Sequence, residues 1–497
     1  MKWKLVISAA LVGCLLAVPA LAAPSVKLSG STFTIKEALN DEIVAQIKAD
    51  EGKVRNKAEL GFTADEISNE DLARLCSLYP AMNALTVKSR KVDNLAPLAG
   101  LTGLKRLTLT VQATDLSPLK GLTGLTNMEV DSPMTPDLAW MSNLKALTRV
   151  SLRGKGPLSL VGLPSLPKLG SIAVRNVTIA DLTPLVEALP GLTNVDLMSS
   201  TIADLSPLCK LAKLNYLNLY GCTVKDFSPL AGCATLKKII YYATKDADYS
   251  TLGKLTQVTD MDGGLTKMDN IGWVANLPNL RTFDVFAEYV TDYSPLSKTR
   301  VEQFQVWNMR VPVGDMAAIG QTVSLKKLTL WDVEGASNSK SLAGLVNLEE
   351  VVIRGYNAKK GGEPFDMNAA AKWSKVSKAT FENASFINSD GLSGMTAVRD
   401  LRIQKANLKA DTPLSLAFLG KLSALKSLTI DESKVSNPEA LAQCTGLTHV
   451  RIVKTEGMTS LAPLQKLPNL KQVTVSKGKF PEAELTGFAQ GVKVVQN

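Results

Sequence analysis

The sequence predicts an α/β solenoid, because a phrase of about 22 residues repeats through most of its 497 residues. The clearest copy is LSPLCKLAKLNYLNL, at residues 205–219. Its leucines first lie three residues apart, which suits short turns, and finally two apart, which is the period of a β-strand. Copies in the same phase begin near Ala73, near Leu461 and at regular intervals between them, which gives about 18 units. Each unit is expected to place one strand in a parallel sheet on the concave face and a short 3₁₀ or loop segment on the convex face.

This spacing of leucines is the signature of leucine-rich repeats. The phrases LSPLKGLTGL (116–125) and IADLSPL (202–208) resemble those of bacterial leucine-rich-repeat proteins of the internalin-like kind. The resemblance implies an open arc whose concave face binds other proteins, in some members host receptors. One departure concerns the inward asparagine that follows the strand in that family, since Ser200 and Cys222 stand there in this chain. A weaker ladder of side-chain bonds to the backbone is therefore expected.

The first residues predict export. Residues 1–22 combine a basic start, an apolar run and the small residues ALA before Ala23, as in a secretory signal peptide cleaved after Ala22. A rival interpretation takes LVGC, ending at Cys14, as a lipobox that would make Cys14 a lipid anchor. No second apolar run is long enough to span a membrane. The expected location is therefore periplasmic or extracellular.

The remaining chain divides into three predicted parts. Residues 23–72 form an N-terminal helical cap, 73–477 the repeat solenoid and 478–497 a C-terminal cap. Helices are predicted near residues 34–50 and 63–79, the second with Thr63 and Glu66 as a capping box. Extra residues near 335–340, 355–366 and 405–413 are expected to bulge as loops.

Composition argues against catalysis and against a metal or cofactor site. The single histidine, His449, excludes histidine-paired nucleophiles and multi-histidine metal sites. Asp260 and Asp262 share one strand face and could act as an acid–base pair or hold a cation, but solvated charge is the favoured interpretation. No glycine-rich phosphate loop accompanies them. No enzyme activity and no cofactor are therefore expected.

Charge and cysteines add weaker constraints. The net charge of +10 favours anionic surfaces without identifying one, and no run of Lys and Arg suggests a nucleic-acid partner. Cys76, Cys233 and Cys444 occupy apolar steps of the repeat, Cys222 an inward position, and Cys209 an exposed one. Their spacing allows a disulfide but does not require one.

Aromatic side chains at outward strand positions mark the predicted binding surface. Aromatic residues make up only 5% of the chain, yet six of them fall at outward positions of neighbouring units in its middle third. Exposed aromatic clusters are typical of binding surfaces. The alternative is that the rings pack against each other as cross-strand pairs of purely structural value. The predicted ligand-binding residues are Tyr216, Tyr220, Tyr242, Asp260, Asp262, Asp284, Phe286, Trp307, Lys327 and Trp331.

Three functions fit this surface. The favoured hypothesis is a secreted or periplasmic recognition protein that holds a protein or peptide in its concave face. The second is a carbohydrate-binding protein of the envelope, which would use the same rings to stack on sugars. The third is a structural spacer without a specific ligand.

Overall fold

The computed structural model describes residues 26–133, 138–244, 247–264, 268–286, 289–307, 312–357, 362–408 and 412–497. The predicted signal peptide and Cys14 lie outside these residues, so the expected export and lipid anchor stay predictions. The chain forms two compact units. The first covers Met1–Thr135 and Trp140–Leu147, and the second covers Pro136–Ala139 and Thr148–Asn497. In the part of the chain that is described, no helix has the length and apolar character needed to cross a membrane.

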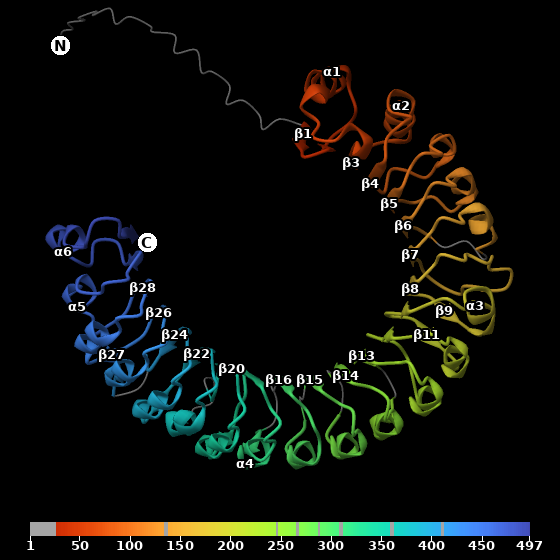
Figure 1. Ribbon diagram of the computed structural model, residues 1–497. Helices are drawn as coiled ribbons and strands as arrows, with labels where there is room; N and C mark the ends of the chain where they lie inside the picture. The colour runs from red at the N-terminus through yellow and green to blue at the C-terminus, as the bar shows by residue number, and fades with distance from the viewer. Residues whose placement is uncertain are drawn as a thin grey trace, which may run out of the picture. The chain divides into compact units, whose positions relative to one another are not determined.

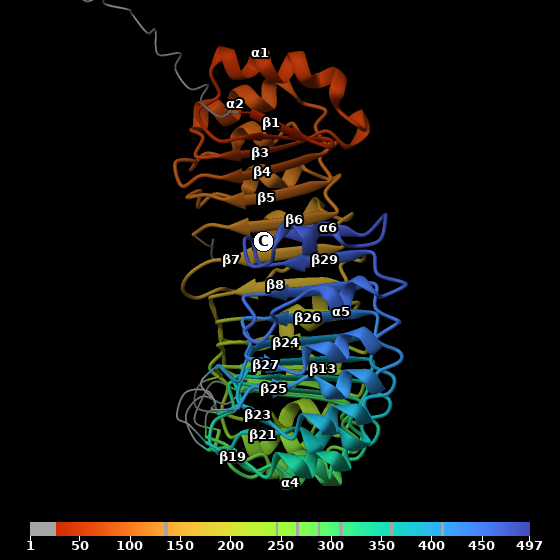
Figure 2. The same cartoon turned by 90° about the vertical axis from the view of Figure 1, so that its left-hand side faces the viewer.

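The first unit opens with an antiparallel hairpin and continues as a parallel sheet. Strands β1 (Val26–Ser29) and β2 (Thr32–Ile35) form the hairpin, and β2 pairs in parallel with β3 (Gly61–Asp65). The sheet continues through β4 (Ala84–Lys88), β5 (Arg106–Thr110) and β6 (Asn127–Asp131), and Figure 2 shows β3, β4 and β5 stacked in chain order. The helical segments of this region are α1 (Asp41–Asp50), α2 (Asn69–Leu78), η1 (Glu51–Lys53), η2 (Lys57–Glu59), η3 (Ala96–Leu98), η4 (Ser117–Gly121) and η5 (Ala139–Asn143).

The two predicted helices of the N-terminal region are shorter than expected. Residues 34 and 35 belong to β2, because Phe33 and Ile35 are fully buried and alternate with the half-buried Thr32 and Thr34. Thr63 lies in β3 rather than at a helix start, so the proposed capping box with Glu66 is wrong. The capping box of α2 is formed by Ser68 and Asp71, whose side chains each accept a hydrogen bond from the other's backbone N–H.

The second unit repeats strand and turn along an arc, with its strands on the inner side and its short helices on the outer side (Figure 1). Each inner strand pairs in parallel with the next inner strand along the chain. These strands are β7 (Arg149–Arg153), β8 (Ser171–Arg175), β10 (Asn194–Asp196), β12 (Tyr216–Asn218), β13 (Lys238–Tyr242), β14 (Asp260–Gly264), β15 (Thr282–Phe286), β16 (Gln303–Trp307), β18 (Lys327–Trp331), β20 (Glu350–Arg354), β22 (Lys378–Ala384), β24 (Asp400–Ala406), β26 (Ser427–Asp431), β28 (His449–Val453), β29 (Gln472–Val475) and β30 (Lys493–Gln496).

Shorter elements complete each turn of the second unit. Two-residue strands pair as β9 (Thr178–Ile179) with β11 (Thr201–Ile202), β17 (Gly314–Asp315) with β19 (Ala336–Ser337), β21 (Phe365–Asp366) with β23 (Phe386–Ile387), and β25 (Leu414–Ser415) with β27 (Val435–Ser436). The helical segments are α3 (Thr183–Ala188), η6 (Ser206–Lys210), η7 (Ser228–Gly232), η8 (Tyr249–Lys254), η9 (Gly272–Asn276), η10 (Ser294–Lys298), α4 (Ala317–Gly320), η11 (Ser339–Gly344), η12 (Met367–Lys372), η13 (Ser389–Gly394), η14 (Ala417–Lys421), η15 (Pro438–Gln443), α5 (Ala462–Gln465) and α6 (Glu482–Thr486). The predicted α/β solenoid is thus confirmed.

The repeated phrase folds as the spacing of its residues dictates. In the copy at 205–219, all six leucines are at most 3% exposed. The Asp204 carboxylate accepts a hydrogen bond from the Ser206 N–H at 2.8 Å, which fixes the turn that opens η6. Hydrogen bonds from Ser206 also lower the pKa of Asp204. Pro207 lies in the first turn of η6, where its missing N–H costs nothing.

The inward position after the strand still bonds the backbone of a neighbouring unit. Ser200 Oγ donates to the Val174 carbonyl oxygen at 3.2 Å, and Cys222 Sγ donates to the Leu197 carbonyl oxygen at 2.9 Å. Asn357 bonds both the N–H and the carbonyl of Ala336. Because a thiol is a weak donor, the bond from Cys222 is weaker than one from a hydroxyl or an amide.

The ends of the predicted long units are partly ordered as strands. The segment predicted to bulge near 335–340 contains β19, and Phe365 and Leu414 begin β21 and β25. Residues 358–361 and 409–411, which belong to the other two predicted bulges, lie outside the described residues. At the C-terminus, the predicted amphipathic stretch 482–490 is helical only over α6, and β30 continues the sheet by pairing with β29.

Cys209 and Cys233 form a disulfide between adjacent turns, with their Cα atoms 4.2 Å apart. The sequence allowed a disulfide without identifying its partners, and it placed Cys233 at an apolar step of the repeat; Cys233 is buried there, only 3% exposed, and forms the disulfide. Cys76, Cys222 and Cys444 are buried free thiols, as predicted. Burial raises the pKa of Cys76 and Cys222 to about 12, which keeps both as unreactive thiols.

Replacing Cys209 and Cys233 together with serine is expected to lower the free energy of unfolding by about 3 kcal/mol, because the disulfide closes a loop of about 24 residues in the unfolded chain. Denaturant unfolding followed by circular dichroism measures this change. A Cys76→Ser variant serves as a control for thiol loss outside the disulfide. A double variant as stable as the wild type would show that the two thiols are not joined in the folded protein.

Candidate ligand-binding surface

The inner strands of the second unit present three outward rows of side chains. In β13, Lys238, Ile240 and Tyr242 are half-buried, while Ile239 and Tyr241 between them are fully buried. The same alternation holds in β15 and β18. Since the strands pair in register, corresponding residues of neighbouring strands lie side by side at about 4.8 Å. The three rows are named first, middle and third in the direction of the chain.

The third row carries five of the six predicted rings. Tyr220 and Tyr242 pack with ring centroids 6.2 Å apart. Phe286 and Trp307 lie 5.6 Å apart, and Trp307 and Trp331 lie 4.6 Å apart. Tyr216 starts its strand in the first row, next to Lys238, and therefore does not belong to this series. The third-row rings Tyr220, Tyr242, Phe286, Trp307 and Trp331 are called the aromatic row below.

Gly264 divides the aromatic row into two groups. It occupies the third-row position of β14, between Tyr242 and Phe286. Its φ of +118° disfavours other residues, and an added β-carbon would collide with the backbone of Phe286. The predicted single track is thus divided into a pair of tyrosines and a stack of three rings. Between them lies β14, which has no side chain at its third-row position.

Arg354 extends the stack beyond Trp331. The guanidinium carbon of Arg354 lies 4.5 Å from the centre of the Trp331 ring, which is a cation–π contact. Arg354 also pairs with Glu382 at 3.2 Å. Sequence reasoning missed this residue, because a guanidinium over a ring becomes visible only once the register of β18 and β20 is known.

The rings are partly exposed and partly packed on each other. Tyr220 is 39% exposed, and Tyr242, Phe286, Trp307 and Trp331 are half-buried. Within the described residues, Trp307 Nε1 is buried without a hydrogen-bond partner. The structural alternative, mutual packing along the sheet, is therefore realised within each group, while each ring remains partly exposed to solvent.

Three aspartates lie beside the gap in the aromatic row. Asp262 of β14 and Asp284 of β15 are direct neighbours in the middle row, and Asp260 occupies the first row of β14. Burial and then the charge of Asp262 raise the pKa of Asp284 to about 6, and the nearby Lys238 opposes this shift. Burial, followed by Asp262, also raises the pKa of Tyr242. Among the described residues, these aspartates are not part of a three-residue cluster placed to hold a metal ion.

The Asp284→Asn variant is expected to be more stable than the wild type at pH 7.5, by about 1 kcal/mol after allowance for solvent screening of a partly exposed group. The folded pKa of about 6 lies above the ordinary value of 3.8, so ionisation of Asp284 weakens the fold as pH rises through 4 to 6. Thermal unfolding of both proteins at pH 4 and pH 7.5 measures the difference. It should be much smaller at pH 4, where the carboxyl is almost fully protonated in the folded state and about half protonated in the unfolded state; a less stable variant at pH 7.5 would contradict the account.

Lys327 lies at the edge of this surface rather than among the aspartates. Its ammonium is 3.5 Å from the Glu350 carboxylate, and it shares that partner with Lys378. The structure therefore brings together the aromatic row and the three aspartates, and places Tyr216 and Lys327 at its margins.

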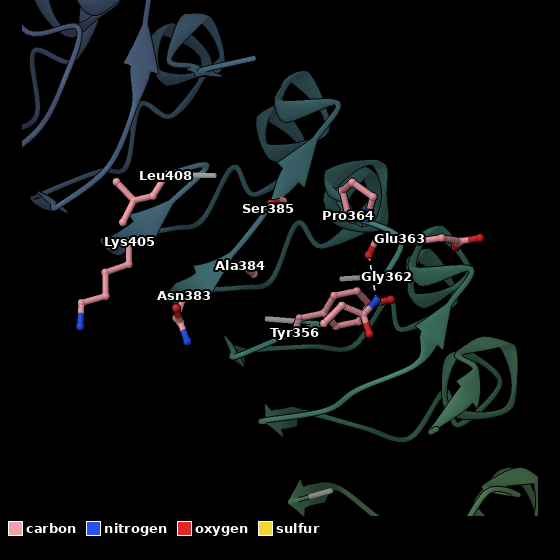
Figure 3. A pocket seen from close by; sticks show the side chains of 10 residues that line it. Tyr356, Gly362, Glu363, Pro364, Asn383, Ala384, Ser385, Lys405 and Leu408 are labelled. Carbon is pink, nitrogen blue, oxygen red and sulfur yellow. Dashed lines mark hydrogen bonds between the residues drawn. The ribbon is translucent and has the colours of Figure 1, made fainter. Parts of the chain in front are cut away.

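A separate pocket of about 290 Å³ lies further along the second unit, beside the ends of β20, β22 and β24 (Figure 3). Its lining includes Tyr356, Asn383 and Lys405. The Asn357 amide in its wall donates to the Glu363 carbonyl oxygen at 2.8 Å and also bonds Ala336. These hydrogen bonds stabilise the local turn. The pocket is distinct from the candidate surface, because none of the aromatic row or the three aspartates lines it.

Comparison with solved structures supports the fold assignment. The TLR13–ssRNA13 complex is similar with a TM-score of 0.53 at 15% identity, over 84% of this chain and 70% of that chain. An internalin from Listeria monocytogenes is 18% identical over 77% of this chain and 83% of its own, with a TM-score of 0.32. A leucine-rich-repeat protein from Leptospira interrogans is 15% identical over 88% of this chain and 92% of its own, with a TM-score of 0.42. No protein-family model and no curated protein matches the sequence.

The chain therefore has the leucine-rich-repeat fold that its sequence predicts. Repeated inner strands, outer 3₁₀ turns and buried leucines define this class. At these low identities the similarity concerns the fold alone.

Proposed function

We propose that this protein is an exported recognition protein that binds a protein or peptide on the inner face of its second unit. The observation that carries the proposal is the aromatic row, whose half-buried rings lie on an open sheet face. Partly exposed Trp and Tyr side chains supply large rigid contact areas and are common anchors of interfaces. Catalysis is not proposed, because the sequence offers no nucleophile–base pair and the similar structures are of leucine-rich-repeat proteins.

The disulfide supports export. Disulfides persist in oxidising compartments such as the bacterial periplasm or the extracellular space. The Cys209–Cys233 bond therefore agrees with the secretory signal that the first residues predict.

An envelope glycan is the second candidate ligand. Asp262 and Asp284 lie beside rings on which a sugar could stack, and carboxylates accept hydrogen bonds from sugar hydroxyls. RNA, the ligand that the name of the TLR13 complex carries, is disfavoured at this surface because the three aspartates repel phosphates. A spacer without a ligand would have no use for accessible rings.

Affinity capture from envelope extracts tests the proposal. The purified full chain and a Trp307→Ala/Trp331→Ala variant serve as parallel baits, and bound proteins and glycans are identified separately. The wild type should retain one or more proteins that the variant loses. Identical capture by both baits would remove the aromatic row from the function, and loss of a glycan alone would favour the second candidate.

A further inference from the structure

The aspartates beside the aromatic row lack the cationic partners that other acids on the same face possess. Each of the other half-buried or buried acids of the inner strands has one: Asp196 with Arg175, Glu350 with Lys327 and Lys378, Glu382 with Arg354, and Asp431 with Arg451. In the described part of the chain, Asp260, Asp262 and Asp284 make no ion pair, and Lys238 is the cation that acts on Asp284. Among the described inner strands of the second unit, the half-buried acids without an ion pair are therefore those beside the rings.

We propose that the partner of the inner face is a basic polypeptide segment, whose Lys or Arg side chains lie against Asp260, Asp262 and Asp284 while its apolar portions contact Phe286, Trp307 and Trp331. This inference rests on the proposed function and specifies the chemistry of its partner. Two features of the surface are complementary to such a segment. Carboxylates form charge-assisted hydrogen bonds with guanidinium and ammonium groups, and aromatic faces attract the same cations.

Gly264 separates the two groups of rings beside the aspartates. Tyr242 and Phe286 stand two strands apart, about 10 Å between backbones, and the position between them has no side chain. Asp262 and Asp284 occupy the middle row directly beside this position. In the proposal, a lysine or arginine of the partner lies against Asp262 and Asp284, next to the rings on either side of Gly264.

The electrostatic cost of the Asp284 charge in the unbound protein also favours a cationic partner. The pKa of Asp284 is raised because its charge is partly buried next to Asp262 and Asp260. Carboxylates with raised pKa values cluster at functional sites, and a cationic ligand would lower the cost of the Asp284 charge. The surface is locally acidic although the whole chain carries a net charge of +10, so the complementarity is specific to this face.

Selection from a library of random dodecapeptides displayed on phage tests the inference. The purified full chain is the bait at pH 7.5, and a synthetic copy of the most enriched peptide is then measured by calorimetry. The enriched peptides should carry a net positive charge. An Asp262→Asn/Asp284→Asn variant should bind the synthetic peptide at least tenfold more weakly, and Asp400→Asn, which removes an exposed acid from β24 of the same face, should bind it as the wild type does.

The pH dependence provides a second readout. Lowering the pH from 7.5 to 5.0 should weaken binding of the basic peptide by up to about tenfold, because Asp284 is then mostly protonated. The titratable groups that face Asp284 come from two strands: Lys238 and Tyr242 from β13, and Asp260 and Asp262 from β14. On its other side, β16 contributes the uncharged Gln303 and Gln305. Peptide lysines and arginines do not titrate in this range. Asp284→Asn should therefore lose most of this pH dependence.

Several outcomes would overturn the inference. Peptides without net positive charge, or binding that is unchanged in the Asp262→Asn/Asp284→Asn variant, would do so; if such binding still required Trp307 and Trp331, the proposed function would stand. A failure to enrich any peptide would overturn the inference. So would aspartate-dependent binding of a chitosan oligosaccharide in place of a peptide, or self-association of the chain that depends on the aspartates. Binding that is indifferent to both the aspartates and the tryptophans would remove the proposed function as well.

Discussion

Replacing Leu219 with alanine is expected to lower the free energy of unfolding of the second unit by about 2–5 kcal/mol. Leu219 follows β12, is 0% exposed and belongs to the stack of leucines at the centre of the repeat. The alanine leaves a cavity that the neighbouring turns cannot close, because each turn is pinned by pairing with the next. Urea unfolding followed by circular dichroism and tryptophan fluorescence measures the loss.

A matched control for Leu219 is Val323→Ala. Val323 is 56% exposed on a turn of the same unit, so its truncation should change stability by less than about 0.5 kcal/mol. Similar effects of the two substitutions would mean that the leucine stack is not the core of the fold. In a linear array the destabilisation is expected to spread only to neighbouring repeats, which amide hydrogen exchange would reveal as local loss of protection around β12 and β13.

The second large effect concerns binding rather than stability. Changing Trp307 and Trp331 together to alanine is expected to weaken binding of a captured protein partner by about 4 kcal/mol, or roughly a thousandfold, if each ring acts as an interface hot spot. The two rings form the closest aromatic contact of the row and lie outside the leucine stack. Calorimetric titration of the partner into both proteins measures the change.

The fold of the tryptophan variant is the necessary control. Its far-ultraviolet circular dichroism and denaturation midpoint should stay close to those of the wild type, because Phe304, Val306, Leu328 and Leu330 on the opposite faces of the same strands keep the core filled. Thr329→Ala removes a middle-row side chain from the same strand as Trp331 and should leave affinity nearly unchanged. A variant that binds as tightly as the wild type would place the ligand elsewhere.

The repeat architecture could be predicted because it is written in local spacing. The inward positions of the inner strands are apolar in nearly every repeat, and Ser-Pro pairs open several of the turns, as in η6, η7 and η10. Strands β2 and β3 were not predicted from this pattern. Thr63 has the sequence context of a helix start, but Phe62 beside it packs 5.7 Å from the ring of Phe33 and draws the segment into the sheet. Such contacts between distant residues leave no local signal.

The candidate surface was only partly predictable for the same reason. Alternation placed Tyr242, Phe286, Trp307 and Trp331 on the outward face without knowledge of their neighbours. The division of the row at Gly264, the contact of Arg354 with Trp331 and the missing cation partners of the aspartates depend on the register between strands. The Cys209–Cys233 disulfide could not be predicted either, because two cysteines 24 residues apart in the sequence come close together only when neighbouring turns stack.

Footprinting of the complex tests the central claim most directly. Carbene labelling of the full chain, read residue by residue by mass spectrometry, compares the free protein with the protein bound to its captured partner. The account predicts that protection concentrates at Tyr242, Phe286, Trp307 and Trp331, with the outer turns labelled equally in both states. Protection confined to the outer turns, with unchanged labelling of these four rings, would contradict it.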